Sequence, residues 1–183
     1  MTPPASPLPP RKLDPFAAVL SYLVPGLGQI YQGRIGKGVL FLVCLYTLFF
    51  YGMYLGHGEN VYLPDSNTKQ NVLVSWKPLG DIENRPHFAG QFWIGMAAWP
   101  AILQYSRYDE NDNSPILKGW MRAPKEDELN KLQRDGDKRW DLGWVYTVIA
   151  GVLNILVIYD ALAGPAHREA LKKTPAGKEP VAA

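Results

Sequence analysis

Four long stretches without a charged residue constrain the fold of this 183-residue chain more than any other feature. Each is close to the roughly 20 residues that a helix needs to cross the hydrocarbon layer of a membrane. They cover residues 15–33, 38–58, 88–106 and 142–159. The second stretch has no polar face, whereas a helix of a soluble protein keeps one face in water. We therefore expect an all-α membrane protein with four transmembrane helices, over about residues 15–33, 38–57, 88–106 and 142–163.

The segments outside these stretches have the composition of tails and loops. Residues 1–13 form a Pro-rich arm and residues 167–183 a basic tail. Neither can bury enough apolar surface to fold, so we expect both to be disordered around a membrane domain over residues 14–166. The loop at 59–87 contains a short β-prone run, which predicts a mixed, partly extended cap. In the later loop, a proline followed by acidic and then basic residues predicts a short surface helix near 125–135.

The first stretch is interrupted by Pro25 and Gly26. Asp14 followed by Pro15 is a good helix start, because Asp caps the N-terminus and Pro fits the first helical position. Two alternatives follow for the interruption: a span that is kinked at Pro25, or a re-entrant segment that turns back inside the membrane. We favour the kinked span, because residues 27–32 are uncharged. The re-entrant alternative gathers more of the basic residues on one side, as the positive-inside rule prefers.

The most distinctive segment joins the first two stretches and is rich in glycine. Its glycines let the backbone turn sharply and approach a neighbour closely, and the residues that suit a structural turn are Pro25, Gly26 and Gly28. The segment ends where the second predicted span begins, and unpaired N–H groups at a helix N-terminus favour an anion. The candidate contacts for a lipid headgroup or a partner are Gly33, Arg34, Gly36 and Lys37. The alternative is that the glycines serve a tight hairpin and the two basic residues anchor it at the interface.

The last stretch carries two polar residues that need partners. Asn154 lies in the middle of the predicted span, where its amide requires a hydrogen bond to another helix. Asp160 lies near the end of that span, and a carboxylate at a helix C-terminus is disfavoured by the helix dipole. With four spans, the cationic partners on the same side are Arg11 and Lys12. We interpret Asn154 and Asp160 as residues that hold helices together rather than as an ion site.

The segment Pro25-Gly-Leu-Gly-Gln-Ile-Tyr-Gln-Gly-Arg34, followed by a long apolar helix, resembles the bacterial two-transmembrane-helix hairpin domain. Together with the Phe88-Ala-Gly-Gln-Phe-Trp run and the late run from Tyr146 to Ala161, it makes the chain similar to a family of small bacterial membrane proteins of unknown function. The resemblance covers about residues 14–166 and implies a multi-span protein of the bacterial inner membrane. It implies no catalytic residue. The acidic residue that often precedes the aromatic of the hairpin-domain loop is absent, because Gln29 and Ile30 precede Tyr31 here.

The sequence lacks the residue spacings that are typical of catalytic and metal sites. The three histidines are isolated, Cys44 is the single cysteine, and no nucleophile elbow or dinucleotide fingerprint occurs. We expect no enzymatic activity, no metal and no cofactor. The net charge of +2 gives no reason to expect nucleic acid as a partner.

Two functional hypotheses remain. The first is a non-enzymatic membrane scaffold or interaction protein, with membrane lipid and a protein partner or a second copy as its partners. The alternative is a small transporter or channel component with a polar path through Asn154 and Asp160. Pumps carry several ionisable groups inside the membrane, and the scarcity of such groups here favours the scaffold.

Overall fold

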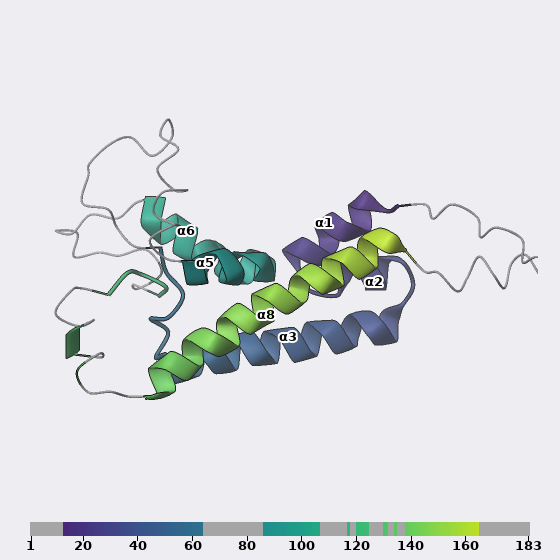
Figure 1. The fold of residues 1–183 in the computed structure, drawn as a ribbon. Helices are drawn as coiled ribbons and strands as arrows, with labels where there is room; N and C mark the ends of the chain where they lie inside the picture. The colour runs from purple at the N-terminus through teal and green to yellow at the C-terminus, as the bar shows by residue number, and fades with distance from the viewer. Residues whose placement is uncertain are drawn as a thin grey trace, which may run out of the picture.

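The computed structural model describes residues 13–63, 86–106, 117, 120–124, 130, 131, 134 and 138–164. Within this part of the chain every regular element is a helix (Figure 1). The helices are α1 (Pro15–Leu23), α2 (Leu27–Tyr31), α3 (Ile35–Leu55), α5 (Pro86–Gln91), η1 (Phe92–Ala98), α6 (Trp99–Ser106) and α8 (Lys138–Ala163). The prediction of an all-α fold is confirmed for these residues.

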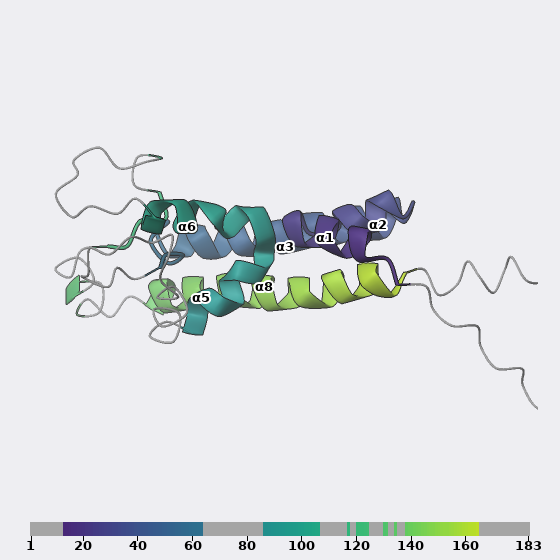
Figure 2. The same ribbon diagram turned by 90° about the horizontal axis from the view of Figure 1, so that it is seen from above.

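Two long antiparallel helices, α3 and α8, run the length of the fold (Figures 1 and 2). Their 21 and 26 residues correspond to about 31 and 39 Å at 1.5 Å per residue. Both are long and apolar enough to cross a membrane. Lys37 at the start of α3 pairs with Asp160 at the end of α8, so the two helices run in opposite directions. The sequence predicted four such spans, and the described residues contain two.

The first predicted span is a helical hairpin made of α1 and α2. Asp14 caps α1 as expected, because its Oδ1 accepts a hydrogen bond from Ala17 N at 3.1 Å. The helix stops before Pro25, whose missing N–H and bulky ring cannot continue it. Gly26 then takes a left-handed backbone (φ +85°), which reverses the chain into α2.

Both ends of this hairpin lie at the C-terminal end of α8. Asp14 N donates to Leu162 O at 2.9 Å, and Gln32 Nε2 donates to Ala161 O at 2.7 Å. These contacts show a hairpin and not the single kinked helix that we favoured from the sequence, and a hairpin is the backbone shape that the re-entrant alternative requires. A kinked span and a re-entrant segment would have the same amino-acid composition. Only the contacts of the hairpin with α8 distinguish the two arrangements.

The third predicted span is also a hairpin, because residues 88–106 are not one continuous helix. Gly95 has φ +82° and ψ −136°, which breaks the helix inside η1. Near the start of this segment the His87 ring lies 5.1 Å from the Trp144 ring, in the first turns of α8. Near its end Gln104 Nε2 donates to Trp120 O at 3.1 Å, and Trp120 lies beside Gly58 after α3. Both ends therefore lie at the end of the fold opposite the α1–α2 hairpin.

The two hairpins enter from opposite ends, and their tips meet midway along α8 (Figures 1 and 2). Gly95 lies against the carbonyl groups of Tyr22 and Leu23 at the end of α1, where a Cβ would be 1.8 Å from Tyr22 O. Each hairpin precedes a long helix, and the two long helices are antiparallel. The fold thus contains the same arrangement twice with inverted direction, as in many membrane proteins built from inverted repeats.

Pairs of glycines bring the helices into close contact at three places. Gly26 packs on Gly38, Gly52 on Gly143, and Gly90 on Gly151. In each pair a Cβ on one glycine would lie within 3.0 Å of the other glycine's backbone. Small residues at helix contacts are typical of packing in membranes, where close approach of backbones supplies the attraction.

Several predictions from the sequence concern residues outside the described part of the chain. The arm at 1–13, apart from Leu13, the tail at 167–183 and the β-prone run within 59–87 lie outside it. Of the surface helix expected near 125–135, the structure describes residues 130, 131 and 134, which are helical and exposed.

We predict that Gly151→Ala destabilises the fold whereas Gly36→Ala does not. A Cβ at residue 151 would lie 2.0 Å from Gly90 O, and overpacking of this kind costs about 1–3 kcal/mol. A Cβ at residue 36 meets nothing within 4 Å, so the better helix propensity of Ala should stabilise by about 0.5–1 kcal/mol. Unfolding in detergent micelles measures both variants. Equal free energies of unfolding for the two variants would contradict the glycine contacts.

Candidate functional site

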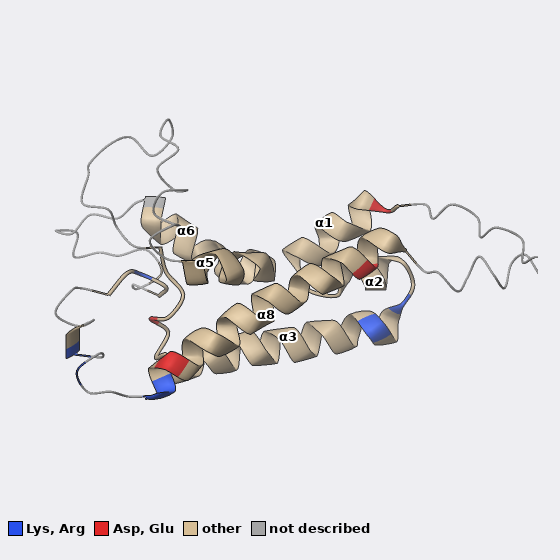
Figure 3. Cartoon of the chain, in the orientation of Figure 1, with Lys and Arg blue, Asp and Glu red and all other residues tan. Residues whose placement is uncertain are grey.

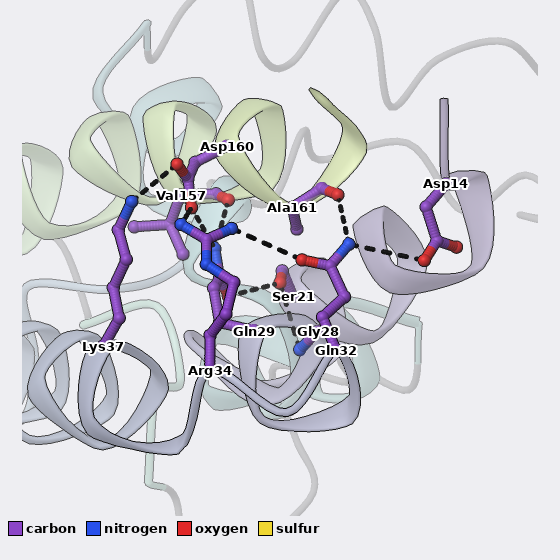
Figure 4. A network of polar contacts seen from close by, with 10 residues as sticks. All are labelled: Asp14, Ser21, Gly28, Gln29, Gln32, Arg34, Lys37, Val157, Asp160 and Ala161. Atoms are coloured by element: carbon purple, nitrogen blue, oxygen red, sulfur yellow. Dashed lines mark hydrogen bonds and ion pairs between the residues drawn. The ribbon is translucent and has the colours of Figure 1, made fainter. Parts of the chain in front are cut away.

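The C-terminal end of α8 carries an ion cluster around Asp160 (Figure 4). Arg34 Nη2 lies 2.8 Å from Asp160 Oδ2, and Lys37 Nζ lies 2.6 Å from Asp160 Oδ1. A carboxylate near a helix C-terminus faces the negative end of the helix dipole, and two cations offset that repulsion. The cationic partners expected from the sequence, Arg11 and Lys12, lie outside the described residues. Among the described residues, Arg34 and Lys37 fill this role.

The start of α3 places both cations on one side of that helix. Arg34 is the N-cap residue and Lys37 follows three positions later, so the two side chains share a face. The Lys37 ammonium also lies 5.4 Å from the centre of the Phe41 ring, a cation–π distance. The carboxylate and both cations are partly exposed: 30% of the Asp160, 18% of the Arg34 and 41% of the Lys37 side chain is accessible.

Glutamine side chains from α2 connect the hairpin to the last turns of α8 (Figure 4). Gln29 Nε2 donates to Val157 O at 2.8 Å and to Asp160 Oδ2 at 3.2 Å. Gln32 Nε2 donates at 2.7 Å to Ala161 O, one of the last carbonyls of α8, which also accepts a 3.2 Å bond from Gly164 N. The hairpin therefore caps the C-terminus of α8 with side chains from another part of the sequence.

Ser21 joins the two arms of the hairpin. Its Oγ donates to Gln29 Oε1 at 3.0 Å and accepts a hydrogen bond from Gly28 N at 3.2 Å, which satisfies a donor at the start of α2. Ser21 and Gln29 are both fully buried. Gly28 must be glycine for this contact, because a Cβ would lie 2.0 Å from Ala17 O.

Asn154 joins the tips of the two hairpins. Its Nδ2 donates to Ser21 O at 3.2 Å and to Trp93 O at 2.8 Å. In a continuous helix the N–H of residue 25 would bond Ser21 O, and Pro25 has none. Trp93 lies two residues before the break at Gly95. One buried amide group thus satisfies a carbonyl from each hairpin.

A second buried polar cluster lies at the opposite end of the fold. Gln91 Nε2 donates to Thr147 Oγ1 at 2.8 Å and to Asn60 O at 3.1 Å, while Asn60 Nδ2 donates to Gly52 O at 3.0 Å. No pattern in the sequence marked these residues, or Ser21, Gln29 and Gln32, as candidate site residues. The sequence feature that could have identified them is the one that identified Asn154: an amide or hydroxyl side chain inside a stretch without charged residues.

The candidate site residues predicted from the sequence lie in three regions of the structure. Pro25, Gly26 and Gly28 form the hairpin turn. Gly33 and Gly36 are exposed beside the ion cluster that holds Arg34 and Lys37. Asn154 and Asp160 lie on α8, where Asn154 contacts both hairpin tips and Asp160 the basic turn. Among the described residues, no three His, Cys, Asp or Glu side chains lie close enough to hold a metal ion.

The outer surface of the helices is apolar along most of its length. The described charged residues lie at the two ends of the long helices (Figure 3). Large hydrophobic side chains are exposed between them, among them Val39, Leu40, Val43, Phe50, Val145, Ile149, Val152 and Leu156. In the most apolar 18-residue stretch of each long helix, only 28% is buried in α3 and 39% in α8. Apolar helices with so much exposed surface suggest association with a membrane.

Comparisons with known proteins identify a family but no activity. Residues 16–174 match DUF6677, a family of unknown function. The Uncharacterized protein MJ1516 of Methanocaldococcus jannaschii is 40% identical over 38 residues, which are 21% of this chain and 38% of that protein. The chain thus covers well under two thirds of the length of this relative. No solved structure matches the chain.

We predict a favourable coupling between Arg34 and Asp160 in a double-mutant cycle with Arg34→Gln and Asp160→Asn. Both groups are partly exposed, so solvent screens the pair and the expected coupling is about 1 kcal/mol. Unfolding in detergent measures it. Lys37→Gln with Asp14→Asn is the matched control, for which we expect coupling near zero. Equal coupling in the two cycles would contradict a specific Arg34–Asp160 interaction.

Proposed function

The chain belongs to DUF6677, a family of unknown function, and from its residues we propose that it is a non-enzymatic membrane scaffold or interaction protein. It is a multi-pass protein of a cell membrane. Two features support this: the apolar surface exposed along α3 and α8, and the position of the described charges at their ends (Figure 3). A water-soluble protein rarely exposes so large an apolar surface.

In this proposal four segments enter the membrane and two of them cross it. The lengths of α3 and α8 suit the roughly 30 Å hydrocarbon layer. The two hairpins enter from opposite sides and end near the middle. Interrupted helices are tolerated at this depth only where protein surrounds the exposed backbone groups, and Asn154 and Ser21 supply such partners here.

The observation that carries the scaffold role is how the buried polar groups are used. Gln29, Gln91 and Asn154 each donate hydrogen bonds to another segment of the chain. Asp160 is paired with two cations. Groups that move ions must exchange their partners, whereas these groups connect the hairpins to α8 and fix their positions. This use favours a scaffold over a transporter or channel component.

The partner that fits the basic turn is an anionic lipid headgroup. Arg34, Lys37 and Asp160 together carry a formal charge of +1, at the end of the fold where α3 begins. The first turn of α3 contains no acidic residue, and no side chain caps it. Gly33 and Gly36 are exposed, which leaves the backbone accessible to a phosphate. Such a turn attracts the negative surface of a membrane leaflet.

The membrane arrangement predicts on which side each end of α3 lies. In a Cys44→Ser background, we would introduce single cysteines at Gly36, His57 and Leu117, three exposed positions. Labelling of intact cells or sealed vesicles with an impermeant thiol reagent should place Gly36 on one side and both His57 and Leu117 on the other. Four full crossings would place His57 and Leu117 on opposite sides, and that result would overturn the re-entrant arrangement of residues 88–106.

The lipid role predicts weaker retention of anionic lipid when both cations are removed. We expect Arg34→Gln with Lys37→Gln to lower the ratio of retained phosphatidylglycerol to phosphatidylcholine about tenfold or more, since each cation near the surface contributes about 1 kcal/mol. Native mass spectrometry of protein purified from mixed vesicles measures this ratio.

Asp160→Asn is the matched control, because it breaks the same ion pairs but leaves both cations. It should keep or increase the retention of phosphatidylglycerol. An unchanged ratio in the double variant would contradict the lipid role. Loss of a bound second copy or protein in that variant would instead identify the turn as a protein interface. An ion flux in vesicles that Asp160→Asn abolishes would overturn the scaffold role itself.

A further inference from the structure

The carboxylate of Asp160 already occupies both cations of the basic turn (Figure 4). Its Oδ1 lies 2.6 Å from Lys37 Nζ and its Oδ2 lies 2.8 Å from Arg34 Nη2, so one oxygen faces each cation. Carboxylates and phosphates bind such cations in the same way, through oxygens that accept charge-assisted hydrogen bonds. The Asp160 carboxylate therefore holds the donors that the headgroup of an anionic lipid would need.

An anion can reach this cluster from the surface, because the side chains of Asp160, Arg34 and Lys37 are all partly exposed. A phosphate that bound while the carboxylate stayed in place would lie close to a second negative charge. Like charges at contact distance repel each other. The phosphate and the carboxylate are therefore alternatives, and each excludes the other from the two cations.

Displacement of the carboxylate requires only a movement of its side chain. Asp160 lies near the C-terminus of α8, where the helix dipole disfavours a negative charge, so its position depends on the two cations. If it moved, the 3.2 Å bond from Gln29 Nε2 would be lost. The hairpin would stay attached, because Gln29 Nε2 also donates to Val157 O and Gln32 Nε2 donates to Ala161 O.

We infer that Asp160 is an internal competitor of the lipid: its carboxylate occupies the anion site of the basic turn, and an anionic lipid headgroup binds by displacing it from Arg34 and Lys37. This inference rests on the proposed lipid role of the turn and adds the regulation of that site. By linkage, each anion weakens the binding of the other by the same factor. The competition lowers the affinity of the turn, so that its occupancy follows the anionic lipid content of the leaflet.

Removal of the competing charge should strengthen lipid binding. In native mass spectrometry from mixed vesicles, we expect Asp160→Asn to raise the ratio of retained phosphatidylglycerol to phosphatidylcholine about fivefold, the effect of one charge near a membrane surface. Asp14→Asn is the matched control, because it removes a carboxylate at the same end of the fold that bonds Ala17 N and Gln32 Nε2 and no described cation. An unchanged ratio in Asp160→Asn, or an equal rise in both variants, would overturn the competition.

The displacement can also be measured in the wild-type protein, so the test does not depend on the folding of a variant. Carbodiimide labelling followed by mass spectrometry reports how accessible each carboxylate is, and Asp14 serves as the internal reference. Phosphatidylglycerol added to the detergent micelles should raise the labelling of Asp160 relative to Asp14, whereas phosphatidylcholine should not. No rise would overturn the inference. An equal rise with inorganic phosphate at the same concentration would overturn the lipid as the displacing anion.

The double variant Arg34→Gln with Lys37→Gln separates this inference from the proposed function. If that variant loses phosphatidylglycerol while Asp160→Asn retains no more than the wild type, only the competition is overturned. If it retains as much as the wild type, the lipid role of the turn is itself overturned. Loss in the double variant together with a gain in Asp160→Asn supports both.

Discussion

The amide of Asn154 supplies the hydrogen bonds that allow two interrupted helices to end inside the fold. A helix that stops at membrane depth leaves carbonyl groups without donors, and no water is present to replace them. Pro25 removes the helical donor for Ser21 O, and Asn154 Nδ2 donates to this carbonyl and to Trp93 O, two residues before the break at Gly95. Because both carbonyls bond the same nitrogen, the two hairpins meet at one point on α8.

The base of the α1–α2 hairpin, away from its tip, is held to the C-terminal end of α8 by ion pairs and by hydrogen bonds to the last carbonyls of that helix. Gln32 and the backbone of Asp14 bond carbonyls at the end of α8, while Arg34 and Lys37 pair with Asp160. The hairpin is therefore attached to α8 both at its tip and at its base. Glycine contacts allow the backbones to approach closely enough for these bonds to form. Polar attachment inside and an apolar surface outside fit the membrane scaffold that we propose, and the basic turn stays partly exposed at one end of the fold.

Much of the local structure could be predicted from the sequence. The charge-free stretches correctly marked the helical regions, Asp14 and Pro15 correctly marked the start of α1, and Asn154 was expected to need a partner on another helix. These features depend on a few neighbouring residues or on composition, which the sequence displays directly. The number of crossings was not predictable in this way. A re-entrant hairpin and a full span have the same length and the same hydropathy, and Gly95 looks like any other glycine in an apolar helix.

The sequence by itself therefore determined an all-helical chain with membrane-length apolar segments and a basic, glycine-rich turn before its longest uninterrupted apolar run. The tertiary structure decided which segments double back, which cations pair with Asp160, and which carbonyls Asn154 serves. The physical reason is that these interactions join residues far apart in the sequence: 126 positions for Arg34 and Asp160, and 61 for Trp93 and Asn154. Their partners are selected by packing of the whole fold, and no local pattern of residue types specifies them.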